Sequence, residues 1–341
     1  DWMCVPAAWD ENIAKCKMTK EETNAWSLTL SSSVRSWFGV TNGMPIQKLG
    51  LVFRSADGKK QESNAYISVT DKSFNPPTSS NASVPTGLLE GVNVIDASSV
   101  TFVLYDKDKN GNHKDFAYVI GDFNDWKIDN AYQMKRDEAA GCWWHTVTGL
   151  NGQTEYAFQY YVGTKADGNI RLADAYTEKV IDPVDAEISA TTYPGLRQYP
   201  SDKTAGVIST FKTVKDTYNW KNGDFKVADK NNLVIYEMLL RDFTTSGDIN
   251  GALDKLDYIK AMGANAIELM PVQEFDGNDS WGYNPCFYFA MDKAYGTKDD
   301  FKAFIDACHG KGIAVLLDVV YNHATGSHPF AKLYWNMEKN E

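Results

Sequence analysis

The sequence lacks any apolar run of roughly 18 residues, the length that a membrane-spanning helix requires, so no membrane span is predicted. It also lacks an excess of positive charge, because its formal net charge is −11 at pH 7. Proteins that bind nucleic acid need a basic surface, so this charge argues against nucleic acid and against anionic membrane surfaces as partners. A neutral ligand is compatible with the composition.

Cysteine is scarce and shows no site-like spacing. The five cysteines form no C-x-x-C pair and no zinc pattern. Cys4 and Cys16 are close enough in sequence to form a disulfide, although nothing else in the sequence supports one. Cys308 falls on the apolar face of a predicted helix and is expected in a core.

The chain starts without a basic segment followed by an apolar one, and its first residue is Asp1. Two interpretations follow, a cytoplasmic protein or a protein whose signal peptide has been removed. We favour the second, which predicts a secreted, periplasmic or cell-surface protein.

Aromatic residues are abundant, with 10 Trp and 18 Tyr. Flat aromatic faces can stack on sugar rings, but most aromatic side chains contribute buried area to a core. Each single Trp is therefore first expected in a core.

Three units are predicted from the 341 residues, since a domain averages roughly 150 residues. Residues 1–90 are predicted to form a β-sandwich module that could bind glycan, with a hairpin turn at Asp57-Gly58 and a linker over 75–90, where "NPPTSSNASVPTG" is rich in Pro, Ser and Asn. Residues 91–205 contain short aromatic and β-branched runs between turns, which is typical of an immunoglobulin-like sandwich.

Residues 206–341 change to an alternating pattern. The apolar runs "NLVIYEML", "NAIELMPV" and "IAVLLDVV" are separated by helical spacings, including Phe301, Phe304, Ile305 and Cys308. A capping box of Thr297 and Asp300 starts that second helix. This order predicts a parallel sheet buried on both faces, in either a (β/α)8 barrel or a doubly wound sheet. A barrel needs about 250 residues, so only its first part is present.

Polar groups follow these strands, at the edge where α/β proteins place their sites. "DVVYNH" puts Asp318 in an apolar strand, where a carboxylate needs a partner, and a purely structural ion pair would satisfy it equally well. Strand alternation would separate Asp318 and Asn322 from His323 unless the chain curls out of the sheet. A lone His at a strand end is often only a surface group. The combination of polar residues in "DVVYNH" is harder to explain in that way.

"GTKDDFKAFIDACHGKGIAVLLDVVYNH", preceded by "SWGYNPCFYFA", closely resembles the α-amylase superfamily, glycoside hydrolase family 13, and most of all its pullulanase, branching-enzyme and neopullulanase-like branch. The resemblance implies a (β/α)8 TIM barrel that acts on α-glucosidic bonds with retention of configuration. It implies that Tyr283, with Trp281 beside it, stacks on a sugar and that His323 hydrogen-bonds its hydroxyls. It also implies that Asp318 holds the barrel interior, paired with an arginine just before the nucleophile. It makes Asn322 a weak candidate for a calcium ligand and a further substrate contact.

"GDFNDW" and the strands around it resemble the β-sandwich of carbohydrate-binding module family 48 over about residues 92–190. In that family the Asn and Trp of the motif are often structural. We therefore expect Trp126 in a core or a domain interface rather than on a sugar-binding platform.

A calcium loop is also suggested by "DKDKNGNHKDFA", residues 106–117, which starts with suitably spaced Asp106, Asp108 and Asn110. Ala117 occupies the position of the required Glu, and strands flank the segment, so a polar hairpin tip is the better interpretation. No cofactor is required by the predicted chemistry, and calcium remains possible.

The catalytic groups themselves are not predicted in this chain. In the resembling family a nucleophilic Asp, an acid/base Glu and a third Asp follow barrel strands four, five and seven, and this sequence ends after strand three. The nucleophile and the acid/base are therefore expected C-terminal to Glu341, in a longer glycoside hydrolase that acts on starch, glycogen, pullulan or maltooligosaccharides. The alternatives are a non-catalytic glycan-binding fragment and a branching transglycosylase.

Overall fold

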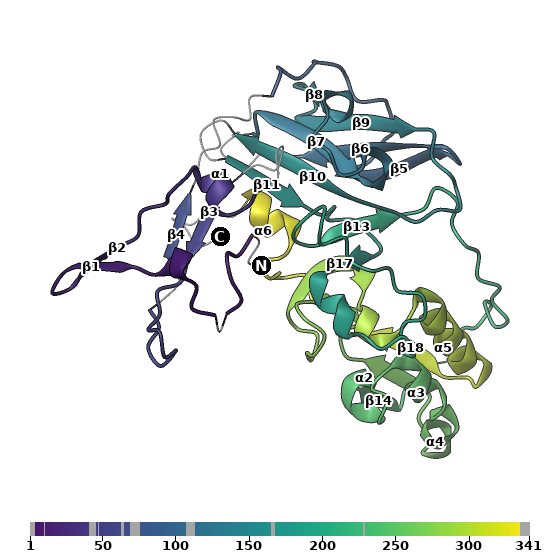
Figure 1. The fold of residues 1–341 in the computed structure, drawn as a ribbon. Coiled ribbons are helices and arrows are strands. Elements are labelled where there is room, and N and C mark those ends of the chain that lie inside the picture. The colour runs from purple at the N-terminus through teal and green to yellow at the C-terminus, as the bar shows by residue number, and fades with distance from the viewer. Residues whose placement is uncertain are drawn as a thin grey trace.

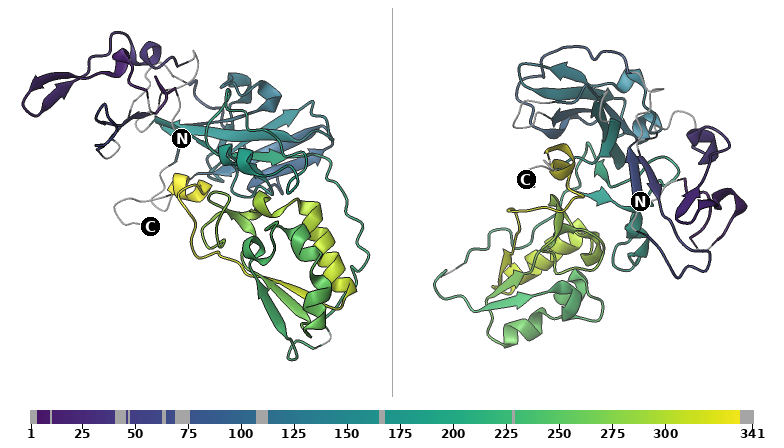
Figure 2. Two further views of the ribbon diagram at one scale, coloured as in Figure 1. Left: turned by 60° about the horizontal axis from the view of Figure 1, so that its bottom comes forward. Right: turned by 90° about the vertical axis from the view of Figure 1, so that its left-hand side faces the viewer.

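The computed structural model describes residues 4–9, 11–40, 46, 48–62, 65–68, 76–106, 113–164, 168–227 and 229–334 (Figure 1). Within them lie N-terminal hairpins, a two-sheet β unit and an α/β unit. Figure 2 shows the two larger units lying against each other, while the N-terminal hairpins project away from both. No helix in these ranges has the length and apolar character needed to cross a membrane.

The N-terminal unit contains two separate antiparallel pairs, β1 with β2 and β3 with β4. The predicted turn at Asp57-Gly58 is confirmed, because Gly58 N–H donates to Ser55 O (2.9 Å) at a φ of +70° and β3 pairs with β4 beyond it. The predicted sandwich is not seen in the described part of this unit, where β1 is exposed along its whole length. Its elements are η1 (Ala14–Cys16), β1 (Thr19–Glu22), β2 (Ala25–Ser27), α1 (Val34–Trp37), β3 (Lys48–Leu51) and β4 (Ala65–Ser68).

The second unit is a sandwich of two antiparallel sheets. One sheet has the order β5-β6-β9-β8, and the other has the order β11-β10-β13-β12 with β7 also paired to β10. Phe102 and Trp143 from the first sheet and Phe158 and Tyr160 from the second share one core. The strands are β5 (Gly91–Asp96), β6 (Ser99–Tyr105), β7 (Phe116–Gly121), β8 (Lys135–Asp137), β9 (Cys142–Thr148), β10 (Tyr156–Thr164), β11 (Gly168–Leu172), β12 (Val180–Ile181) and β13 (Ile208–Phe211).

Three short 3-10 helices complete this unit, η2 (Asp122–Asn124), η3 (Asn130–Tyr132) and η4 (Pro183–Glu187). β13 pairs with β10 and β12, so the second sheet continues beyond the predicted boundary at residue 205. The other predicted domain boundaries stay predictions.

The "GDFNDW" motif is a structural turn. Trp126 is only 5% exposed, and its Nε1 donates to Asp122 Oδ1 (3.1 Å). Asp122 also accepts two hydrogen bonds from Arg197, and Asn124 accepts from Gly121 N–H (3.0 Å). The expectation that Trp126 lies in a core is confirmed.

The predicted calcium loop falls mostly outside the described residues, since 107–112 are among those not described. Asp106 at its start is buried, and it accepts hydrogen bonds from Arg136 Nη1 and Trp143 Nε1, both at 2.7 Å. This carboxylate therefore has an ion pair inside the sandwich.

The α/β unit contains a parallel sheet of order β14-β15-β18. Its helices pack on one face, where Ile259, Ile267, Phe304 and Cys308 form a core. The elements are β14 (Ile235–Met238), α2 (Leu240–Phe243), α3 (Ile249–Leu253), α4 (Leu256–Ala261), β15 (Ala266–Leu269), β16 (Gln273–Phe275), β17 (Pro285–Met291), η5 (Lys293–Tyr295), α5 (Lys298–Gly310), β18 (Ala314–Leu317) and α6 (Pro329–Tyr334).

Sequential strand order with helices on one face is typical of the first part of a (β/α)8 barrel, whereas a doubly wound sheet carries helices on both faces. The capping box of Thr297 and Asp300 at the start of α5 is confirmed, and so is the buried position of Cys308. All five cysteines are free, so Cys4 and Cys16 do not form a disulfide.

The expectation that the sheet is buried on both faces is wrong for the described residues. Ile235 is 48% exposed, and Glu237 next to it along the open face is also exposed. The apolar runs predicted a covered strand, but sequence alone does not show which element covers each face.

The sandwich contains a carboxyl group that should make its stability fall as the pH rises. Asp174 is 2% exposed, and burial raises its pKa to about 6 although Tyr160 OH donates to it (2.6 Å). The unfolded chain releases this proton near pH 4, while the native state keeps it to about pH 6. The native state therefore binds more protons in that window, and about 3 kcal/mol of stability should be lost between pH 4 and pH 7.

Denaturant unfolding at several pH values checks this prediction. Asp174→Asn should make the loss between pH 4 and 7 smaller by about 3 kcal/mol, because the amide does not titrate. The control Asp96→Asn changes an exposed sandwich carboxylate whose pKa is lowered, mainly by the hydrogen bond from Ser98 N–H, and it should leave the loss in place. An unchanged slope in Asp174→Asn would contradict the assignment.

Candidate functional site

Three predicted site residues meet at the carboxyl end of β18. Asp318 directly follows the strand, and its backbone N–H still donates to Leu269 O (2.9 Å) in the neighbouring β15. The phenol of Tyr283 donates to Asp318 Oδ2 (2.6 Å), and Nε2 of His323 lies 2.8 Å from the carbonyl oxygen of Tyr283. Two segments 35 to 40 residues apart in the sequence are joined here.

The chain leaves the sheet after Leu317, so strand alternation does not place His323 on the opposite face from Asp318. Tyr288 OH donates to His323 O (3.0 Å) and holds the curled segment against β17. Since no strand continues past Leu317, Asp318 and His323 are free to reach the same tyrosine. The arginine expected for Asp318 precedes the nucleophile, which is itself expected C-terminal to Glu341, so this pairing stays a prediction. Within the described residues Asp318 accepts a hydrogen bond from Tyr283.

The electrostatics of this trio follow from its carboxylate. The hydrogen bond to Asp318 raises the pKa of Tyr283 to about 12, with burial and the nearby charges of Asp318, Glu237 and Glu268 adding to the effect. Tyr283 therefore stays a neutral hydrogen-bond donor at physiological pH. Its ring is 40% exposed, so a ligand can reach one face.

Trp281 and Asn322 lie next to the trio in sequence but outside its hydrogen bonds. Trp281 is 60% exposed, and Asn322 is exposed on the turn between Asp318 and His323. Within the described ranges no three His, Cys, Asp or Glu side chains come together as a metal site would need. Calcium also binds amide and backbone carbonyl oxygens, so this finding does not test Asn322, and its role as a calcium ligand stays a prediction.

The C-terminal residues 335–341, which end at Glu341, lie outside the described residues. The expectation that the nucleophile and the acid/base follow Glu341 therefore stays a prediction. The described part of the chain supplies the groups around Tyr283.

Gly282 fixes the turn that presents Tyr283. Its φ is +90°, and a Cβ atom there would lie 2.3 Å from the carbonyl oxygen of Pro271. Ser280 Oγ accepts from Gly282 N–H (3.0 Å) and also hydrogen-bonds Asn284. The shape of the loop that carries the exposed rings of Trp281 and Tyr283 is thus fixed by Ser280, Gly282 and Asn284.

Arg241 is a site residue that sequence reasoning missed. Its Nη1 donates to Asp279 Oδ1 (2.9 Å) in the loop that carries Trp281, and its Nε donates to Asp242 Oδ1 (2.8 Å). The loop is also tied by Tyr295 OH, which donates to Ser280 O (3.4 Å). The polar end of "MLLRDF" was the available signal, but its partner 38 residues away could not be predicted.

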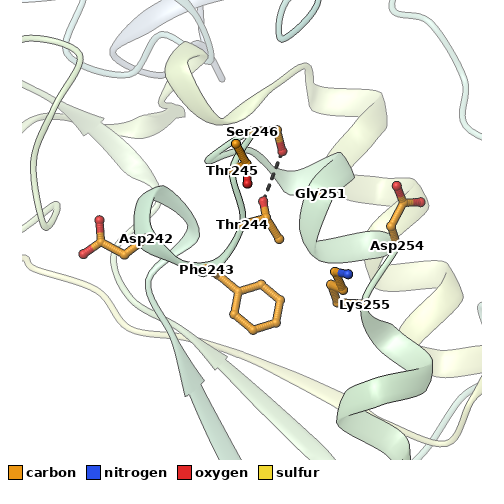
Figure 3. Close-up of a pocket in the computed structure, with 8 residues that line it drawn as sticks. All are labelled: Asp242, Phe243, Thr244, Thr245, Ser246, Gly251, Asp254 and Lys255. Atoms are coloured by element: carbon orange, nitrogen blue, oxygen red, sulfur yellow. Dashed lines mark hydrogen bonds between the residues drawn. The ribbon is translucent and has the colours of Figure 1, made fainter.

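A separate hollow of about 710 Å³ follows β14 (Figure 3). Thr244 and Ser246 hydrogen-bond each other (3.1 Å) on one rim, and Asp254 and Lys255 lie on the turn between α3 and α4. None of the predicted site residues lines this hollow, and Asp242 connects it to Arg241. The trio around Tyr283 is therefore the better candidate site.

Replacement of Gly282 should displace the loop. Gly282→Ala adds about 1–3 kcal/mol of backbone strain and a clash with Pro271, so it should lower the melting temperature and the affinity for an oligosaccharide. Gly277→Ala is the matched control, because Gly277 has a φ of +80° in the same loop but no atom within 4 Å of the place that a Cβ would occupy. Equal effects of the two variants, measured by thermal unfolding and ligand titration, would refute the role of the Pro271 contact.

Known proteins resemble this chain in sequence and in fold. The family described as "Alpha amylase, catalytic domain" matches residues 213–340. Malto-oligosyltrehalose trehalohydrolase of Saccharolobus solfataricus is 33% identical over 155 residues, which are 46% of this chain and 26% of that protein. The 1,4-alpha-glucan branching enzyme of Oceanobacillus iheyensis is 29% identical over 211 residues, 60% of this chain and 30% of that protein.

Among solved structures, a putative alpha amylase from Salmonella typhimurium has a TM-score of 0.54 at 28% identity, covering 73% of this chain and 36% of that chain. The pullulanase SAP of Group B Streptococcus, solved with maltotetraose, has a TM-score of 0.54 at 20% identity and shows the fold alone, with 73% and 36% covered. This chain spans about a quarter of the length of the first curated relatives, 26%, 20% and 28%. The family match, together with these relatives and solved structures, shows that residues 213–340 of this chain belong to the α-amylase superfamily.

Proposed function

We propose that the protein is a glycoside hydrolase that acts on α-glucans with retention of configuration, and that this chain forms one wall of its sugar-binding site. The observation that carries the proposal is the meeting of Tyr283, Asp318 and His323 at the carboxyl end of a parallel sheet. Such an edge is where barrel enzymes bind their substrates. The relatives that act on α-glucans support the substrate class.

The trio offers complementary groups to a sugar ring. The exposed face of Tyr283 can cover the apolar face of a sugar, as an aromatic ring with a polar tip does at many binding sites. A carbonyl oxygen only accepts, so Nε2 of His323 carries the proton that points to Tyr283 O. In the neutral ring Nδ1 is then an acceptor for a sugar hydroxyl, and Asp318 accepts from a second one.

The bond-breaking groups are assigned elsewhere. A retaining glycosidase needs two carboxyl groups about 5–5.5 Å apart, one as nucleophile and one as acid/base. The family resemblance gives neither role to Glu237 or Glu268, so we place both roles on later barrel strands of the whole protein. This chain contributes substrate binding to that reaction.

A branching transglycosylase is a second candidate, favoured by the identity to the branching enzyme of Oceanobacillus iheyensis. The trehalohydrolases add malto-oligosyltrehalose as a substrate to test. A location outside the cytoplasm stays a prediction from the N-terminal sequence.

Removal of the Tyr283 ring should weaken binding of maltotetraose by about tenfold or more, which equals about 1.4 kcal/mol. Tyr283→Ala loses the ring face, whereas Tyr283→Phe loses only the hydroxyl that donates to Asp318 and should bind more tightly than the alanine variant. Tyr258→Ala is the control, since Tyr258 is an exposed tyrosine on α4, away from the trio. Isothermal titration calorimetry measures all three, and unchanged affinity in Tyr283→Ala would remove this residue from the site.

The activity is tested on the full-length protein with starch, pullulan and malto-oligosyltrehalose. Hydrolysis should release reducing sugar, and proton NMR should show the α-anomer first if configuration is retained. New α-1,6 linkages without net release of reducing ends would support the branching enzyme instead. Binding of glucan with neither product would contradict both enzymatic proposals.

A further inference from the structure

One lysine is fully enclosed where the sandwich meets the α/β unit. Lys293, at the start of η5, is 2% exposed and forms an ion pair with Glu274 in β16. Its Nζ also lies 3.4 Å from Oδ1 of Asp185, which belongs to η4 of the sandwich. Asp292, 1% exposed, completes a cluster of one cation and three carboxyl groups drawn from both units.

The cluster depends on this one cation. Burial raises the pKa of Glu274 well above its usual range and that of Asp292 to about 6, while the carboxylates keep Lys293 protonated. A buried charge without a partner is costly, so loss of the lysine would leave Glu274 and Asp185 facing each other without compensation. Within the described residues, Oε2 of Glu274 is buried without a hydrogen-bond partner.

A small cavity of about 20 Å³ lies beside Glu274, lined by apolar side chains from both units that include Val180, Val207 and Phe275. That volume accommodates one water molecule, which Oε2 of Glu274 would hold. Lys293, Glu274 and Asp292 are 2%, 5% and 1% exposed, so the cluster is buried at the interface and is not a solvated surface network.

The interface around the cluster is built on the ribbon of β16 and β17. Cys286, Phe287 and Ala290 of β17 pack with sandwich residues in one apolar cluster. The ribbon's connecting loop, residues 276–284, carries Trp281 and Tyr283. Asn278 in that loop donates to the sandwich carbonyl of Val184 (2.7 Å), one residue before Asp185.

We propose that Lys293 is a positioning residue, which fixes the loop 276–284 and its aromatic rings by fastening the β16–β17 ribbon to Asp185 of the sandwich. The sandwich then serves the site as a rigid support behind the loop. Its own aromatic residues need not touch a glycan for this role, and Trp126 is buried in its core. The part of the inference that concerns ligand affinity rests on the proposed glucan-binding function.

The test is hydrogen–deuterium exchange with mass spectrometry on the full-length protein, read at residues 276–284, beside titration with maltotetraose. Lys293→Met should raise amide exchange in this loop by about tenfold and weaken the affinity for maltotetraose by a similar factor. Two controls separate positioning from general destabilisation. Lys298→Gln removes an exposed lysine that pairs with sandwich Glu178 across the same interface (2.6 Å), and Arg136→Met removes the buried partner of Asp106 inside the sandwich.

Both controls should leave exchange in the loop 276–284 at the wild-type level. If Lys293→Met does not fold, Asp185→Asn answers the same question, because it removes the negative charge that Lys293 meets from the sandwich and leaves the ion pair of Lys293 with Glu274. The amide oxygen of the asparagine can still accept the hydrogen bond that Asp182 N–H donates to Asp185 in η4 (2.9 Å). Wild-type exchange in the loop of Asp185→Asn, or an equal rise in Arg136→Met, overturns the proposal. Failure of the wild-type protein to bind maltotetraose would count against the proposed function, while the exchange result still decides the role of Lys293.

Discussion

The parallel pairing of β14, β15 and β18 in one register is the constraint on which the candidate site depends. Met238, Leu269 and Leu317 lie side by side at the ends of the three strands, so the chain leaves the sheet at one common edge. Asp318 stays in register for one more hydrogen bond, to Leu269 O, before the chain turns away. Polar groups from distant segments therefore lie together at this edge, and the core between the sheet and its helices holds the strands in position. The same edge brings Arg241, in α2 shortly after β14, within reach of Asp279.

Local patterns in the sequence predicted the elements well wherever one residue type has one physical role. The capping box of Thr297 and Asp300 predicted the start of α5, because its hydrogen bonds are local to four residues. The turn at Gly58 needs a positive φ, which glycine supplies. Contacts between segments that are distant in the sequence were harder to predict. Nothing in the sequence near Lys293 reveals that its partner Asp185 lies in another unit, about 100 residues earlier.

The site was predictable as a set of residues and not as a geometry. The family resemblance carried by "WGYNP" and "DVVYNH" indicated Tyr283, Asp318 and His323, and the structure joins these three. The hydrogen bond from the phenol of Tyr283 to Asp318 was not predicted, and the arginine that the family resemblance implies for Asp318 stays a prediction. Gly282 was part of the motif, but its need for space beside Pro271 becomes visible only when two loops are seen together.

Two motifs in this chain combine polar and aromatic residues, and the exposure of their aromatic rings separates them. In "GDFNDW" the indole of Trp126 is buried and its N–H is paired with Asp122, which Arg197 neutralises. A motif whose polar groups are all used internally has nothing left to offer a ligand. In "SWGYNP" the polar residues also bond to one another, yet the rings of Trp281 and Tyr283 remain exposed. The hydrogen bonds within "SWGYNP" fix the backbone of the loop, while the rings of Trp281 and Tyr283 stay exposed to a ligand. A preorganised binding site requires such an arrangement.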